Sequence, residues 1–267
     1  MTRVITAIIG IPILIYVIKF APPSVFTATV LLAMFLSLFE YFQLTREHGS
    51  VKAAWPAYLI ATAVLLSFYF VHFQLQFYFP LGAALVLLVA LFARLEPLAA
   101  LQATAFALFG AWYVGGLLGY MVGVRMIDAG GETGADLTLM LFVIIWSADS
   151  FAYLAGKSFG RHKLSAVSPN KTVEGAVAGF IFGIVGALVC RYVFAPQLSV
   201  KDAVILGAVV GTFGQIGDLC ESLLKRSAGV KDSGSVIPGH GGMLDRLDSL
   251  LFGAPAMYYY FYLFLHK

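Results

Sequence analysis

One polar stripe in the sequence combines carboxylates, a hydroxyl and a lysine inside an otherwise apolar segment. Its members are Asp218, Glu221, Ser222 and Lys225. Because they are spaced three, four and seven residues from the first, they share one face of a helix. A single charge at the end of a membrane helix can be explained by snorkelling towards water, but an ordered stripe of this kind indicates a functional site.

A second pair of carboxylates follows after a polar loop. Asp245 and Asp248 are three residues apart in "MLDRLDSLLF" and project from one side of the first turn of a helix. The helix dipole also favours carboxylates at this position, which is the purely structural explanation. Mg²⁺ takes oxygen ligands and is commonly held by one or two carboxylates together with substrate phosphates. We therefore predict that Asp218 and Asp245 share one such ion.

Two polar loops could supply the contacts that phosphate groups need. In and just after the loop 225–242, the predicted phosphate-binding cations are Lys225, Arg226, Lys231 and Arg246. The stretch "PGHGG" adds a flexible backbone whose amides can approach phosphates closely. The loop 157–172 carries Lys157, Arg161, Lys163 and the turn "SPNKT", and we expect it to form a second wall. Metal, cations and glycines together indicate phosphoryl chemistry.

The composition indicates that these groups are carried by a membrane protein. The chain has 267 residues, of which 60% are hydrophobic and 12% charged, and its mean hydropathy is +0.89. A typical soluble domain has about 25% charged residues. We predict an all-α, polytopic integral membrane bundle. Cys190 and Cys220 lie in or beside apolar runs and form no disulfide or zinc pattern.

The apolar segments divide into nine candidate spans, each about 20 residues long. They are 4–20, 24–44, 55–73, 77–93, 98–124, 138–156, 173–194, 203–224 and 247–265. Nine spans place 12 of the 17 lysines and arginines on the side of the N-terminus and of both polar loops. Positive residues stay cytoplasmic, so we expect the N-terminus and the active site to face the cytoplasm. Asp149 lies inside a span and should face the bundle interior or water.

From Ser222 to Asp248 the chain reads "SLLKRSAGVKDSGSVIPGHGGMLDRLD" and resembles the signature of the phosphatidate cytidylyltransferase (CDP-diacylglycerol synthase) family. Every fixed position of that signature is met. The resemblance extends upstream through "GDLCES", "SPNKTVEG" and "WSADSFAYLAGKSFG", and so covers about 146–250. Asn170 stands where the family more often has a lysine, which puts that position alone in doubt.

The resemblance implies that CTP and phosphatidate react to give CDP-diacylglycerol and pyrophosphate in phospholipid biosynthesis, with Mg²⁺ as cofactor. It leaves open a second cation. It also implies a homodimer with a helical membrane fold. We expect a bacterial cytoplasmic (inner) membrane location, and no nucleic-acid partner. We divide the chain into an N-terminal region, 1–136, that provides scaffold, dimer and lipid contacts, and a catalytic region, 137–267.

The residues that match the family are assigned two roles. Catalysis is assigned to Asp218, Ser222, Lys225, Arg226, Asp245 and Asp248, of which Asp218 and Asp245 match the metal-binding positions. Substrate binding is assigned to Asp149, Lys157, Asn170, Lys171, Lys231, His240, Gly241, Gly242 and Arg246. The phosphate of phosphatidate is already a charged nucleophile, so we expect positioning and charge neutralisation, without a strong base, to drive an in-line attack on the α-phosphorus of CTP.

Three other functions fit the sequence less well. An ion-coupled transporter would also place aspartates in spans, but it needs no long loop of Lys, Arg and Gly, and matching broken helices are missing. An intramembrane aspartyl protease could use Asp149 and Asp218, but "GQIGD" lacks the expected GxGD pattern, and neighbouring cations disfavour a shared proton. A CDP-alcohol phosphotransferase would show a DGxxAR…GxxxDxxxD pattern, which the sequence does not contain.

Overall fold

The structure, a computed structural model, describes residues 2–46, 54–70, 75–93, 96–128, 133–234 and 241–265. Within these ranges the chain is almost entirely helical, and the one β-type pairing is an isolated bridge between Lys163 and Thr172. The prediction of an all-α fold is therefore confirmed. The helices are α1 (Thr2–Lys19), α2 (Pro23–Leu44), α3 (Ala54–Ser67), α4 (Leu75–Phe92), α5 (Pro97–Gly110), α6 (Leu117–Arg125), α7 (Thr133–Phe159), α8 (Val173–Val193), α9 (Val200–Ser227) and α10 (Leu244–Tyr260).

Two π-helical segments complete the helices. The segment η3 (Ala111–Gly116) joins α5 to α6, so that helix continues from residue 97 to residue 125, and η4 (Phe261–Leu265) extends α10. The predicted spans coincide with these elements to within a few residues at most boundaries. The exception is α3, which ends at Ser67 although the apolar run continues. The predicted span follows hydropathy and therefore includes the whole apolar run. The helix itself ends earlier, because the backbone turns at Phe68–Phe70.

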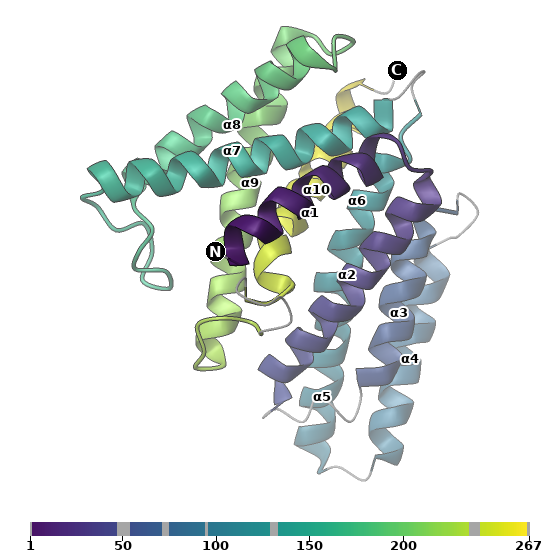
Figure 1. Cartoon of the computed structure of the whole chain (residues 1–267). Coiled ribbons are helices and arrows are strands. Elements are labelled where there is room, and N and C mark those ends of the chain that lie inside the picture. The colour runs from purple at the N-terminus through teal and green to yellow at the C-terminus, as the bar shows by residue number, and fades with distance from the viewer. Residues whose placement is uncertain are drawn as a thin grey trace.

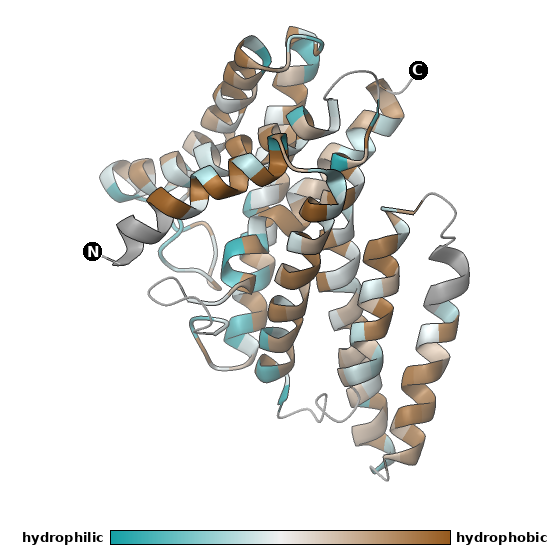
Figure 2. Ribbon diagram, turned by 45° about the vertical axis from the view of Figure 1, so that its right-hand side comes forward, coloured by the Kyte–Doolittle hydropathy of each residue, from teal (hydrophilic) through white to brown (hydrophobic). Residues whose placement is uncertain are grey.

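Among the residues that the structure describes, five helices are long and apolar enough to cross a membrane: Pro23–Leu44, Pro97–Arg125, Thr133–Phe159, Val173–Val193 and Val200–Ser227. Shorter apolar helices occur at Ile8–Lys19, Ala54–Ser67 and Pro80–Phe92. Hydrophobic residues cover most of the length of the helices (Figure 2). Many large apolar side chains are exposed, such as Phe92 at 78% and Val193 at 73%, as a lipid-facing surface requires. The total of nine spans and the side of the N-terminus stay predictions.

The helices form two groups that meet at α10. Helices α2 to α6 stand together on the right of Figure 1, while α7, α8 and α9 occupy its left and upper parts. Helix α10 contacts α9 and α7 on one side and α6 and α2 on the other. Because α10 begins directly after the predicted catalytic loop, the start of this helix lies where the N-terminal and C-terminal halves of the chain meet.

Small residues allow the helices of the C-terminal half to approach closely. A side chain at Gly207 of α9 would place its first carbon 2.6 Å from the Ile184 Cα and 2.8 Å from the Gly183 oxygen, both in α8. Such glycine contacts are typical of helix packing in membranes. No hydrophobic driving force brings helices together in lipid, so close van der Waals packing has to do so. The α8–α9 contact fixes the direction of α9, and with it the position of the polar stripe.

Candidate active site

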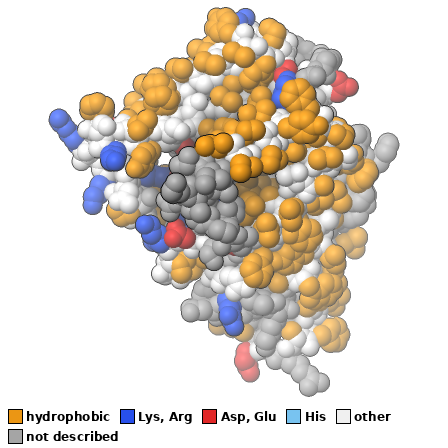
Figure 3. All heavy atoms as spheres, viewed as in Figure 1, with side chains coloured by type: hydrophobic (Ala, Val, Ile, Leu, Met, Phe, Trp, Pro, Cys, Tyr) orange, Lys and Arg blue, Asp and Glu red, His pale blue; other side chains and the backbone are white. Residues whose placement is uncertain are grey.

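A cavity of about 610 Å³ lies at the end of the C-terminal helices and is lined by seven of the fifteen predicted site residues. It is bordered by α7, the 160–172 loop, the start of α8, α9 and the start of α10. Its charged and amide-bearing lining residues are Asp149, Lys157, Asn170, Lys171, Gln215, Asp218, Asp245 and Asp248. Lysine and arginine side chains gather on the surface at the left of Figure 3, where α7 ends. The structure therefore brings together residues that are up to 99 positions apart in the sequence.

Three carboxylates form the acidic centre of the site. One oxygen from each of Asp218, Glu221 and Asp248 lies within 4.8 Å of the others. Glu221 is fully buried, and one of its oxygens forms an ion pair with the Lys225 ammonium. Asp248 accepts one hydrogen bond, from the Ser249 N–H at 2.6 Å. Clustered carboxylate oxygens of this kind fit a hard divalent cation.

Two lysines form ion pairs with the carboxylates of the site. The Lys171 Nζ lies 2.6 Å from an oxygen of Asp218. The Lys225 Nζ lies 2.6 Å from Asp245 Oδ1 and also pairs with Glu221. Both ammonium groups are mostly shielded from solvent, with side-chain exposures of 27% for Lys171 and 12% for Lys225. Lys171 lines the cavity, so an anion that enters would meet a cation that is already held in place.

The loop after α7 is an ordered hairpin that carries Lys171 to Asp218. The Leu164 N–H donates to the Lys171 carbonyl at 2.9 Å, and the Lys171 N–H donates to the Ser168 carbonyl at 3.0 Å. At the start of α8 the Thr172 hydroxyl accepts a hydrogen bond from the Gly175 N–H at 3.1 Å, a usual N-cap. This loop also contacts the end of α9, where the Arg226 Nε donates to the Val167 carbonyl at 3.4 Å. The two polar loops thus meet, as the predicted topology required.

Asp245 is held within the protein by three donors. Besides Lys225, it accepts hydrogen bonds from the N–H groups of Ser233 at 3.0 Å and Gly242 at 2.9 Å, both on Oδ2. Gly242 follows Gly241, whose φ of +80° favours glycine. Asp245 lines the same cavity as Asp218, but it is not a member of the three-carboxylate cluster in the described residues. The shared ion between Asp218 and Asp245 stays a prediction.

The remaining predicted residues lie at different distances from the cavity. Asp149 lines it and accepts a 3.5 Å hydrogen bond from the Ser249 hydroxyl. Ser222 is buried in α9 and does not border the cavity. Three exposed cations, Arg226, Lys231 and Arg246, surround the site without lining the cavity. Arg226 donates to the Val230 carbonyl at 2.7 Å. His240 lies outside the described residues.

Sequence reasoning gave no role to two acidic residues that the structure places at the site. Glu221 was recognised as part of the polar stripe, but its place beside Asp218 and Asp248 was not predicted. Glu40 of α2 reaches the start of α10, where it accepts hydrogen bonds from the Met243 and Leu244 N–H groups. The signal for Glu40 was available, because it is a lone charge inside an apolar span, as Asp149 is.

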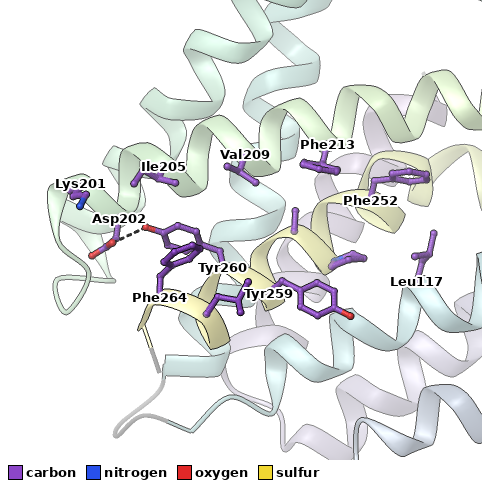
Figure 4. Close-up of a pocket in the computed structure, with 13 residues that line it drawn as sticks. Leu117, Lys201, Asp202, Ile205, Val209, Phe213, Phe252, Tyr259, Tyr260 and Phe264 are labelled. Atoms are coloured by element: carbon purple, nitrogen blue, oxygen red, sulfur yellow. Dashed lines mark hydrogen bonds between the residues drawn. The ribbon is translucent and has the colours of Figure 1, made fainter. Parts of the chain in front are cut away.

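A larger cavity of about 1000 Å³ lies elsewhere, between α9, α10, η4 and Leu117 of α6 (Figure 4). Aromatic and aliphatic side chains dominate its lining, including Phe213, Phe252 and Tyr259. Its two charged lining residues are Lys201 and Asp202, and Asp202 accepts a 2.8 Å hydrogen bond from the Tyr260 hydroxyl. This groove contains none of the predicted site residues, so the smaller, charged cavity is the candidate active site.

Comparison with known proteins gives consistent matches. A family model described as "Cytidylyltransferase family" matches residues 1–264. The chain is 37% identical to a phosphatidate cytidylyltransferase of Synechocystis sp. over 98% of this chain and 97% of that protein. It is 41% identical to the phosphatidate cytidylyltransferase of Bacillus subtilis over 60% of this chain and 58% of that one. A chloroplastic phosphatidate cytidylyltransferase of Arabidopsis thaliana is 36% identical over 94% of this chain and 70% of its own length.

Proposed function

The chain belongs to the cytidylyltransferase family, and from this premise we propose that it transfers the cytidylyl group of CTP to phosphatidate. The products are CDP-diacylglycerol and pyrophosphate. The observation that carries this proposal is the cavity lined by Asp218, Asp248 and Lys171, with the buried Glu221 and its partner Lys225 next to these carboxylates. A site for two phosphate-bearing substrates needs fixed cations and a place for a divalent ion, and this cavity combines both.

The reaction is one displacement at the α-phosphorus of CTP. An oxygen of the lipid phosphate forms a bond to that phosphorus, and the bond to the bridging oxygen of the β-phosphate breaks. The electron pair leaves with pyrophosphate. No proton has to be removed from the nucleophile, since the lipid phosphate is ionised at neutral pH. The protein therefore acts by placing the two substrates in line and by neutralising charge.

Lysines and the hairpin supply the neutralising and orienting groups. Lys171 is held by its ion pair with Asp218, and Lys225 by its ion pair with Asp245. Asn170 borders the cavity next to Lys171 and offers an amide to phosphate oxygens. Arg226 is placed at the junction of the two loops and is suited to bind the leaving pyrophosphate through its planar guanidinium.

A magnesium ion fits the charge pattern of this cavity. Four carboxylates and two lysines line it among the described residues, so the lining is acidic although both substrates are anions. Asp218, Glu221 and Asp248 offer three oxygens for such an ion, and Asp245 would join them if Lys225 released its Oδ1. When bound, Mg²⁺ would be held by these carboxylates and would neutralise charge that develops on phosphate oxygens.

The position of the cavity suits an amphiphilic substrate. Tyr153 lines it and is 67% exposed on the apolar surface of α7, so the cavity borders the lipid-facing surface. The headgroup of phosphatidate can enter from there while its acyl chains stay in lipid. We place this end of the bundle at the cytoplasmic side of a bacterial inner membrane, because the two loops there belong to the side that carries most of the lysines and arginines.

A direct test is pyrophosphate release by the purified protein, with CTP, phosphatidate and Mg²⁺ each omitted in turn. Release that requires all three supports the proposal. Release that continues without phosphatidate would indicate hydrolysis of CTP and would contradict it. The family resemblance also leads us to propose a homodimer, for which light scattering of the detergent-solubilised protein should give twice the 28.8 kDa chain mass after correction for bound detergent.

A further inference from the structure

Glu40 is a buried charge in the N-terminal half of the chain. It lies one turn before the end of α2, between Phe39 and Tyr41, and is 1% exposed. An ionised side chain in an apolar helix is costly and is retained where its interactions matter. The carboxylate of Glu40 is therefore expected to have specific partners, and it has them in the catalytic half.

The partners of Glu40 are the first backbone groups of α10. Its Oε1 accepts a hydrogen bond from the Met243 N–H at 2.9 Å, and its Oε2 accepts one from the Leu244 N–H at 2.8 Å. The N-cap residue, Met243, has no side-chain acceptor of its own. Since the first N–H groups of a helix need external acceptors, Glu40 caps α10 from another helix.

Glu40 also shares a partner with Asp245. The Ser233 hydroxyl donates to Glu40 Oε2 at 3.0 Å, while the Ser233 N–H donates to Asp245 Oδ2 at 3.0 Å. Asp245 in turn accepts from the Gly242 N–H at 2.9 Å. The two carboxylates thus hold Ser233 and Gly242, which lie at the two ends of the segment before α10.

Two glycines pack so closely against the Glu40 carboxylate that neither position has room for a side chain. A side chain at Gly234 would place its first carbon 2.8 Å from the Glu40 Oε1. At Gly242 such a carbon would collide with the Ser233 hydroxyl and with the Glu40 carboxylate. Both glycines are close to the ends of the same segment, so the carboxylate is enclosed by the backbone that it anchors.

We propose that Glu40 is a positioning residue for cytidylyl transfer: from α2 it fixes the first turn of α10 and thereby the positions of Asp245 and Asp248. This inference rests on the proposed function. It gives the N-terminal region a part in the reaction in addition to the scaffold, dimer and lipid contacts expected of it.

The test compares Glu40→Gln with Ser37→Ala in the full-length purified protein. Glutamine keeps the shape, but it must turn an NH₂ group towards either the Met243 or the Leu244 N–H. Loss of one charge-assisted hydrogen bond corresponds to about tenfold or more. We expect kcat for pyrophosphate release to fall by about that factor, and amide hydrogen exchange in the first turn of α10 to accelerate similarly, with exchange in α8 unchanged. Ser37 is buried one turn earlier on α2 and has no hydrogen-bond partner among the described residues, so its variant should behave as wild type.

The following outcomes decide whether Glu40 positions the start of α10. Wild-type kcat and wild-type exchange in Glu40→Gln would overturn the proposal, as would an activity loss that only follows the loss of folded protein. If Glu40→Gln does not fold, Ser233→Ala removes one of the three donors, and a smaller fall in kcat with faster exchange at α10 would support the same role. If the wild-type protein releases no pyrophosphate, the proposed function fails. The hydrogen-exchange measurement still tests whether Glu40 stabilises the first turn of α10.

Discussion

Replacement of Lys225 by methionine should destabilise the protein strongly, because two carboxylates depend on this one ammonium group. Lys225 pairs with Glu221, which has no exposed surface, and with Asp245 Oδ1 at 2.6 Å. Methionine fills a similar volume but leaves the charge of Glu221 uncompensated. Removing one partner of a buried ion pair typically costs about 3–5 kcal/mol. The lower end, about 3 kcal/mol, applies here because Asp245, the other partner of Lys225, lines an open cavity.

A double-mutant comparison isolates the contribution of the uncompensated charge. At roughly 2–4 °C per kcal/mol, Lys225→Met should lower the apparent unfolding temperature by about 6–12 °C. Adding Glu221→Gln removes the stranded charge, and the double variant should recover most of that loss. The assay is thermal unfolding in one detergent, followed by intrinsic fluorescence. Lys157→Met, which removes an exposed charge that also lines the cavity, is the matched control and should change the unfolding temperature little.

Two results would refute this reasoning. One is a Lys225→Met variant as stable as the control. The other is a double variant no more stable than Lys225→Met, since Glu221 would then not be the group that needs the ammonium. Activity is measured in parallel and should stay low in the double variant, because the cation proposed to bind phosphate is still absent.

Further predictions concern the metal, the leaving group, the topology and the helix packing. Asp218→Asn should lower turnover by orders of magnitude with partial rescue by excess Mg²⁺, and near-normal turnover would remove Asp218 from the proposed ion site. Arg226→Lys should lower kcat and kcat/KM for CTP together if the guanidinium binds pyrophosphate as charge develops, whereas a rise in KM alone would place it in ground-state binding. A cysteine at Lys231 in a background without native cysteines should react with an impermeant reagent only in inside-out vesicles, and labelling from the other side would contradict the topology. Gly207→Val should lower the yield of folded protein because its side chain would meet the α8 backbone at Ile184, and a normal yield would argue against that close contact.

The sequence predicted the fold class and most helix positions because both depend on local patterns. Apolar runs marked the helices, and in the structure Pro23 occupies the first turn of α2, a position that proline favours. The caps of α8 and α9 are Thr172 and Ser199, residue types with the usual side-chain acceptor. The end of α3 could not be read in this way, because the apolar composition continues beyond the last helical hydrogen bond.

The site was predicted in its residue types but not in its pairings. The spacing of Asp218, Glu221 and Lys225 placed them on one face of α9, as the structure has them. Which carboxylate of α10 meets that face depends on how the two helices cross, and Gly217 packs so closely against Asp248 that its backbone allows no side chain there. No local pattern encodes that crossing. Nor could the spacing show that Glu40, 203 positions before Met243, caps α10.

The central claim is that this cavity joins the α-phosphate of CTP to a lipid phosphate, and the fate of isotopic label tests it most directly. Purified protein is given phosphatidate, Mg²⁺ and CTP labelled at either the α- or the γ-phosphate, and lipid is then extracted into organic solvent. The account predicts that α-label enters the lipid phase and that γ-label leaves as pyrophosphate in the aqueous phase. It also predicts that Asp218→Asn lowers both by orders of magnitude. Label from the γ-phosphate in lipid, or equal α-label incorporation by wild type and Asp218→Asn, would contradict it.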